Sequence, residues 1–307
     1  MDGQHSKDVG LLATESFAGR TMLLPESLHD LSDAMAIMSH GDAAIFHRCI
    51  RKDLSNVEFC TNVPCLAFVL RGEETFTTPD DEIIPVRPDE MILIGQRVCM
   101  LSDFVGRDGP LEALLFFFDK PTIDSFLSRR PVVRDAGQTR HRPFRIAANQ
   151  TISRYMHSLR IVYDMFAGSP DLVRTKLLEL LFLIDAVDTG GRLDRFLTVE
   201  SNARARRNIA HLMRQHRYHN LSVRDFAALS GRSPASFNRD FKRAFGMPPS
   251  RWLTETRLDR ALDLVRETDL SITAIALEVG YQNTSHFIEV FRTRFGRTPK
   301  KVRMQQF

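Results

Sequence analysis

The chain has 307 residues, of which 43% are hydrophobic and 26% are charged, and its formal net charge is +4. This length can supply two domains with separate hydrophobic cores. No N-terminal stretch has the charged and then apolar form of a secretion signal, so we expect a cytoplasmic protein whose cysteines stay reduced.

The N-terminal half predicts a polar tail followed by a small all-β region. Residues 1–40 are mixed and polar, and we assign them to an N-terminal tail. Residues 41–190 are expected to form a regulatory and dimerisation domain, a β-barrel plus helices. Short apolar segments punctuated by Gly and Pro favour a sandwich or barrel. The predicted strands are Ala44–Ile50, Cys65–Thr77, Glu82–Val86, Met91–Ile94 and Leu111–Phe118.

The strand region offers little for catalysis. A metal-dependent enzyme on such a barrel needs clustered His and carboxylate ligands, whereas this region has only His47 and no His-x-His pair. The chain's four cysteines, Cys49, Cys60, Cys65 and Cys99, lack the Cys-x-x-Cys spacing of a compact zinc site, and cysteines in apolar strands are usually core. We therefore expect no catalytic residues, no metal and no cofactor, with a zinc or methyl-acceptor site as the minor alternative.

Two helices are predicted after the strands. Phe144–Phe166 has apolar residues at helical spacing, and residues 171–187 form a second segment that is apolar on nearly all sides. One interpretation is a homodimer contact through residues 171–187, and the other is complete burial in the same domain. The second segment is too short and too charged to span a membrane. A linker is expected at Asp188-Thr189-Gly190-Gly191.

Residues 203–307 contain an internal repeat, and each copy has the form of a helix-turn-helix. A serine can cap the first helix, a glycine supplies the turn, and phenylalanines four residues apart face inward on the second helix. At an offset of 49, Leu221-Ser222-Val223 matches Leu270-Ser271-Ile272 and Gly231 matches Gly280; at an offset of 50, Phe237, Phe241, Phe245 and Pro249 match Phe287, Phe291, Phe295 and Pro299.

The repeat predicts two helix-turn-helix units joined by a stiff helix. The units are expected at about 222–245 and about 271–295, with the linker helix at about 249–267 and Trp252 in its core. Ser233 and Asn283 are expected to cap the two second helices. Because recognition helices on one face of B-DNA must lie about 34 Å apart, a rigid linker suits DNA binding.

The outward faces of the second helices carry the residues expected to contact DNA. They are Ala235, Ser236, Asn238, Arg239, Lys242 and Arg243 in the first copy, and Thr284, Ser285, His286 and Arg292 in the second. Asn and Arg suit bidentate contacts to base edges, whereas Lys242 and Arg243 suit phosphates. Glu289 replaces Arg239 in the second copy, so we expect the first copy to carry most specificity. The alternative is a solvated charged face. His211, His216 and His219 are expected at the surface or near phosphates, not as metal ligands.

The charge is divided unevenly. Residues 203–307 carry 20 Lys and Arg against 9 Asp and Glu, whereas residues 1–202 carry 22 against 29. A basic end joined to an acidic remainder is typical of a DNA-binding domain attached to something else.

The C-terminal residues resemble the DNA-binding domain of the AraC/XylS family of transcription regulators. The resemblance is carried by Ile275-Ala276, Gly280-Tyr281, His286-Phe287, Phe291, Phe295-Gly296 and Pro299. It implies that Ala235, Asn238 and Arg239, together with Thr284, Ser285 and His286, contact bases. The turns at Leu70-Arg71-Gly72-Glu73 and Arg87-Pro88-Asp89-Glu90 resemble those of the family's cupin-like regulatory domain, and the layout is most similar to its type III secretion activators.

The fold expected from these observations is α+β: an N-terminal cupin-like β-barrel with a helical dimerisation segment, and a C-terminal all-α domain with two helix-turn-helix motifs. The expected function is sequence-specific transcription regulation, as an activator that binds double-stranded promoter DNA and RNA polymerase and answers to a small ligand or a protein partner. The alternative is a ligand- or protein-binding sensor with weak DNA contact, which would lack a steep salt dependence of DNA binding.

Overall fold

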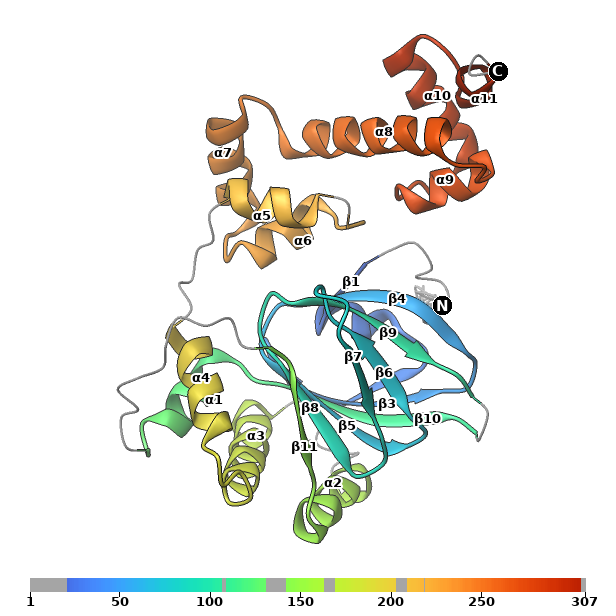
Figure 1. Cartoon of the computed structure of the whole chain (residues 1–307). Helices are drawn as coiled ribbons and strands as arrows, with labels where there is room; N and C mark the ends of the chain where they lie inside the picture. Colours follow the sequence, from blue (N-terminus) through green and yellow to red (C-terminus); the bar gives the residue numbers. More distant parts are fainter. Residues whose placement is uncertain are drawn as a thin grey trace, which may run out of the picture. The chain divides into compact units, whose positions relative to one another are not determined.

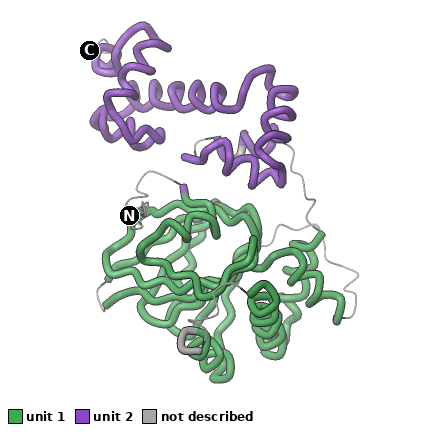
Figure 2. Tube along the Cα trace, turned by 180° about the vertical axis from the view of Figure 1, so that it is seen from behind, with its two compact units in different colours: residues 1–18, 22–203 green, residues 19–21, 204–307 purple. Residues whose placement is uncertain are grey.

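The structure is a computed structural model that describes residues 21–106, 109–130, 142–162, 169–202, 209–217 and 219–304. The described residues divide into two compact units (Figure 2). The first unit contains the described residues between 22 and 203. The second contains Thr21 and the described residues from 204 onward. The first is β-rich and the second helical, which confirms the expected α+β fold.

The first unit contains two β-sheets (Figure 1). The five-stranded sheet has the order β1 (Met22–Leu24), β4 (Leu54–Thr61), β9 (Cys99–Phe104), β6 (Glu74–Thr77) and β7 (Ile83–Val86). The six-stranded sheet has the order β11 (Phe144–Ala147), β8 (Glu90–Ile94), β5 (Cys65–Arg71), β10 (Leu111–Phe117), β3 (Ala43–Ile50) and β2 (Ala34–His40). The pairing of β1 with β4 is parallel, and the other strand pairs are antiparallel.

The six-stranded sheet is apolar on both faces. Phe46 and Phe117 belong to a core that it shares with the five-stranded sheet. Their neighbours Ile45 and Phe116 belong to a second core on the opposite face. Because successive side chains of a strand point to opposite faces, a strand buried on both sides reads as a continuous apolar run. The helices that contribute to the second core are α1 (Lys120–Leu127), α2 (Gln150–Val162), α3 (Pro170–Asp185) and α4 (Arg192–Asn202).

Most of the apolar surface of α3 is buried within its own unit. Val173, Leu177, Leu180, Leu181 and Ile184 are buried against the sheet and its neighbouring helices. Phe182 remains 38% exposed, and its ring lies 5.0 Å from that of Phe126. The other exposed positions of α3 are Asp171, Thr175 and Glu179, which are polar. The arrangement favours the burial interpretation of residues 171–187.

Several strand predictions are wrong in extent. Residues 22–40, assigned to a tail, form β1, a 3₁₀ helix at Glu26–Asp30 and β2. The predicted strand Cys65–Thr77 is split at Gly72, which has a φ of +83°. Strands β4 and β9 were missed because polar residues interrupt their apolar positions. The helix predicted to start at Phe144 starts instead at Gln150. Phe144–Ala147 is strand β11, which pairs with β8. Its predicted end, Phe166, lies outside the described residues.

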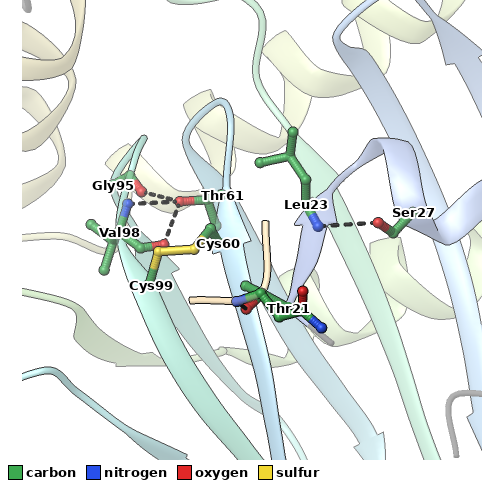
Figure 3. The surroundings of a disulfide bond; sticks show 9 residues. Thr21, Leu23, Ser27, Cys60, Thr61, Gly95, Val98 and Cys99 are labelled. Carbon is green, nitrogen blue, oxygen red and sulfur yellow. Dashed lines mark hydrogen bonds between the residues drawn. A yellow bond between two sulfur atoms is a disulfide. The ribbon is translucent and has the colours of Figure 1, made fainter. Parts of the chain in front are cut away.

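Two cysteines form a disulfide, contrary to the expectation that all stay reduced. Cys60 and Cys99 are direct partners in the register of β4 and β9, and their sulfur atoms are bonded (Figure 3). Beside the disulfide, the Thr61 hydroxyl lies 2.6 Å from the Gly95 carbonyl oxygen, to which it donates. The pair could not be recognised from the sequence because neither strand was predicted. Cys60, Cys65 and Cys99 are buried, as expected of cysteines in strands, and Cys49 and Cys65 are free thiols.

The second unit is helical. Its helices are α5 (Ile209–His216), α6 (Val223–Leu229), α7 (Pro234–Phe245), α8 (Pro249–Glu267), α9 (Ile272–Glu278), α10 (Thr284–Phe295) and α11 (Pro299–Arg303). The long α8 connects the α6–α7 pair to the α9–α10 pair (Figure 1). Across the described residues of the whole chain, no helix has the length and apolar character that crossing a membrane requires.

Candidate DNA-binding interface

The first helix of each pair begins at the serine that the sequence predicts. The Ser222 hydroxyl accepts from the backbone N–H of Asp225 at 3.2 Å, and the Asp225 carboxylate accepts from the backbone N–H of Ser222 at 2.8 Å. This capping box satisfies two backbone donors at the start of α6. At the start of α9, the Ser271 hydroxyl accepts from the backbone N–H of Ala274 at 3.1 Å. The two copies therefore start their first helices by the same device.

The turns and the second helices are also repeated. Gly231 and Gly280 have φ angles of +68° and +87°, a conformation that strongly favours glycine. Ser233 caps α7, with Pro234 in its first turn, and the Asn283 side chain accepts from the backbone N–H of His286 to cap α10. The sequence predicted each of these caps and turns.

The inward face of α7 packs onto the linker helix. Phe237 and Phe241 are fully buried, and the ring of Phe245 stacks on that of Phe241 at 4.4 Å. The Trp252 ring of α8 lies 5.6 Å from Phe245 and 6.0 Å from Phe241. Trp252 is therefore part of the packing between α7 and α8, as predicted, and this packing fixes which face of α7 is exposed.

On both α7 and α10, the residues predicted to contact DNA lie on the face away from the buried phenylalanines. Arg239 and Arg243 are 68% and 76% exposed at their side chains. The exposed members of the predicted set are Ala235, Asn238, Arg239, Lys242, Arg243, Ser285, His286 and Arg292, and the half-exposed members are Ser236 and Thr284. Glu289 is also exposed, so the charge difference from Arg239 is displayed at the surface of α10.

Asn238 is partly engaged by its own helix. Its side-chain amide nitrogen donates to the Pro234 carbonyl oxygen at 2.9 Å. A bidentate contact to adenine needs both the amide N–H and the carbonyl oxygen of an asparagine. Asn238 must therefore release or share this hydrogen bond to make such a contact. Among the described residues, Arg239 makes a looser charge contact, 3.6 Å from the Asp240 carboxylate.

The carboxylate of Asp240, which is not among the predicted DNA-contacting residues, lies between the arginines at the start and along the length of α7. Asp240 Oδ2 lies 3.1 Å from Arg232 Nε, and Asp240 Oδ1 lies 3.6 Å from Arg239 Nε and 3.9 Å from Arg243 Nη2. Arg232 also donates to the Ser230 carbonyl oxygen at 3.1 Å. The hydrogen bond from Arg232, together with the nearby arginine charges, lowers the pKa of Asp240. This cluster could have been inferred from the sequence, because Asp240 lies between Arg239 and Arg243 on the predicted helix.

The same network lines an open groove beside α7. Its volume is about 650 Å³, and its lining residues are Ile209, Ala210, Arg232, Arg239, Asp240, Arg243 and Ala244. In the second copy Val290 occupies the position of Asp240. The described part of α10 therefore lacks an equivalent of this carboxylate. The asymmetry between the copies extends beyond the exchange of Arg239 for Glu289.

The histidines of this unit differ from expectation in one respect. His216, expected at the surface or near phosphates, is buried, and its ring lies 5.0 Å from that of His219. Leu212, Met213 and His216 are spaced three and four residues apart on α5 and share its buried face. His211 is exposed.

Two family models match different parts of the chain. Residues 226–305 match a helix-turn-helix domain, and residues 64–196 match the ExsA N-terminal regulatory domain.

Similar proteins match over limited stretches. An uncharacterised HTH-type transcriptional regulator of Haemophilus influenzae is 41% identical over 81 residues, which is 26% of this chain and 27% of that protein. The HTH-type transcriptional regulator ExsA of Pseudomonas aeruginosa is 32% identical over 134 residues, 44% of this chain and 48% of that one. A structure of apo ToxT from Vibrio cholerae covers 88% of this chain and 100% of its own, with 10% identity and a TM-score of 0.44. The chain thus spans about a quarter and about half of the two curated relatives.

Proposed function

The chain belongs to the AraC/XylS family of transcription regulators, and we propose that it activates transcription by inserting α7 and α10 into successive major-groove segments of promoter DNA. The observation that carries the proposal is the pair of capped second helices, each with an exposed polar face, joined by one continuous helix. Two such helices suit DNA segments that lie about 34 Å apart along one face of the duplex.

The charges assign different roles to the exposed residues. Arg239 and Asn238 are the side chains suited to base edges, and Lys242, Arg243 and Arg292 are suited to phosphates. Glu289 can accept from a cytosine amino group, but its charge opposes close approach to phosphates. We therefore infer that α7 supplies most of the sequence discrimination and that α10 supplies a weaker second contact.

We propose that a regulatory partner binds to the surface of the β-rich unit. The interior between its sheets holds a cavity of only about 20 Å³, lined mainly by apolar side chains together with Arg48, Glu74 and Ser102. A cavity of that size holds about one water molecule. A small organic effector would have to open this interior, whereas a regulatory protein would not. We propose a protein partner, with a small ligand as the alternative.

Two further partners belong to this proposal. An activator bound at a promoter is expected to contact RNA polymerase in the cytoplasm. A homodimer through residues 171–187 would have to use the exposed stripe of α3, in which Phe182 is the large apolar residue. Because Asp171, Thr175 and Glu179 share that stripe, such a dimer is expected to be weak.

The test is footprinting of the purified protein on DNA upstream of its own gene and neighbouring operons, repeated over a series of salt concentrations. The proposal predicts two protected major-groove segments one helical turn apart, with an affinity that falls steeply as salt rises because bound counterions are released. No protection at low salt would reject it and favour the other candidate, a ligand- or protein-binding sensor with weak DNA contact. The exposed Glu289 is the observation that favours that candidate.

A further inference from the structure

Arg257, near the middle of α8, is hydrogen-bonded to the first helix-turn-helix copy and lies near the second. Its Nη2 atom donates to the Leu221 carbonyl oxygen at 3.0 Å, immediately before the capped start of α6. Its charge also interacts with Tyr281, which follows the turn glycine of the second copy. Both side chains are half-buried. Arg257 is therefore hydrogen-bonded to the entry of the first copy and lies near enough to the turn of the second to interact with it electrostatically.

A second contact joins the same two places. A Cβ atom added to Gly280 would lie 2.3 Å from Oδ1 and 2.6 Å from Cγ of Asn220, the residue that precedes Leu221. Such distances are far inside van der Waals contact, so Asn220 packs directly against the backbone of Gly280. The glycine at this turn thus serves two purposes, since it also adopts a positive φ.

These contacts restrict a motion that the linker helix alone does not restrict. The 19 residues of α8 span about 28 Å and fix the separation of the two copies. Each copy is attached to α8 by a short loop, residues 246–248 at one end and residues 268–271 at the other. Rotation about these loops would change the angle between α7 and α10 without changing the length of α8. A tie between the copies at the middle of α8 opposes that rotation.

We propose that Arg257, with Asn220 and Gly280, holds the two helix-turn-helix copies in one relative orientation and so determines the half-site spacing that the protein accepts on DNA. Arg257 is then a positioning residue, because it acts through α7 and α10 and not on the bases. This inference rests on the proposed DNA-binding function.

The structure indicates why arginine suits this position. The planar guanidinium presents several N–H donors in a fixed arrangement, so it can satisfy the Leu221 carbonyl while its charge faces Tyr281. Methionine would keep much of the apolar stem and lose every donor. The matched control is Arg266, which lies on the same helix but is exposed, so that Arg266→Met removes the same charge without touching the junction.

The experiment measures binding of the full-length protein to a set of DNA duplexes. The set starts from the promoter segment that the wild-type protein protects and adds or removes one or two base pairs between its half-sites. Each base pair rotates one half-site by about 34° relative to the other. The wild-type protein and Arg266→Met should lose about tenfold or more in affinity over this series. Arg257→Met should bind all spacings within about threefold of one another.

Retention of the steep spacing dependence by Arg257→Met would overturn the inference, even if that variant bound every duplex more weakly. If Arg257→Met fails to fold, judged by loss of its cooperative melting transition, the smaller change Asn220→Ala decides the outcome by the same criterion. A wild-type protein that binds no duplex rejects the proposed function itself. A wild-type protein that binds, with variants that keep its spacing preference, rejects the spacing role of the junction alone.

Discussion

Asp240 is held by Arg232, with Nε of the arginine 3.1 Å from Oδ2 of the carboxylate, at the side of the helix that carries the predicted base-contacting residues. Arg232 lies in the turn before α7 and Asp240 lies on α7, so the pair joins the turn of the first helix-turn-helix to its second helix. The remaining oxygen of Asp240 faces Arg239 and Arg243.

Asp240→Asn should strengthen non-specific DNA binding and weaken sequence discrimination. Loss of the carboxylate leaves more net positive charge to bind phosphates, so we expect the affinity for random DNA to rise roughly two- to tenfold at low salt. It also leaves Arg239 less ordered, so we expect sequence discrimination to fall. Competition binding with specific and random duplexes measures both effects. Asp263→Asn, an exposed change on α8, is the control for net charge. Unchanged discrimination would show that Asp240 does not order Arg239.

The same pair predicts a dependence of stability on pH. The pKa of Asp240 is lowered in the folded protein, chiefly by Arg232, from its ordinary value of 3.8. A carboxyl with a lowered folded pKa stabilises the fold fully above its unfolded pKa, and the stabilisation is lost as the pH falls through the folded value. The difference in melting temperature between the wild-type protein and Asp240→Asn should be constant above about pH 5 and should disappear on acidification below the folded pKa. A difference that grows on acidification would contradict this.

Arg239→Ala should reduce discrimination between the promoter site and a mutated site more than Glu289→Ala does. One bidentate base contact contributes about 1–3 kcal/mol of discrimination, which corresponds to roughly 5- to 150-fold in relative affinity. Glu289→Ala removes a negative charge near phosphates and should leave discrimination nearly unchanged while raising overall affinity slightly. Titration of both variants against matched and mutated duplexes tests this, and equal losses of discrimination would reject the assignment of specificity to α7.

Ser222→Ala should destabilise the second unit by about 1 kcal/mol, because it removes the capping hydrogen bond at the start of α6. Ser250→Ala is a suitable control, since Ser250 is exposed within α8 and caps no helix. Thermal or urea denaturation gives the comparison. Equal stability of the two variants would mean that water replaces the Ser222 cap without cost.

The disulfide predicts a simple pattern of thiol reactivity. Alkylation of the unfolded, unreduced protein should modify two of the four cysteines, Cys49 and Cys65, and leave the bonded pair Cys60 and Cys99 unmodified. Since the bond links residues 39 positions apart, Cys60→Ser should lower the free energy of unfolding by about 2–4 kcal/mol under oxidising conditions. Cys49→Ser is the control. Mass spectrometry of the alkylated protein detects the pairing, and four modified cysteines would disprove it.

The sequence by itself determined the local features of the second unit. The caps at Ser222, Ser271 and Asn283 and the turns at Gly231 and Gly280 depend on contacts within about four residues, and the inward phenylalanines follow the helical period. Such features can be inferred from residue type and spacing because the interacting groups are close in the chain.

Only the tertiary structure decided the long-range relationships. The pairing of Cys60 with Cys99 depends on the register of two strands whose interrupted apolar pattern gave no signal, and the burial of most of α3 depends on a sheet formed by distant segments. The contacts of Asp240 with Arg232 and of Arg257 with Leu221 span 8 and 36 positions, beyond any single helical turn. The sequence supplied the two recognition helices, and the fold determined how their side chains are ordered and how the helices are held relative to each other, because that arrangement depends on where separate segments pack.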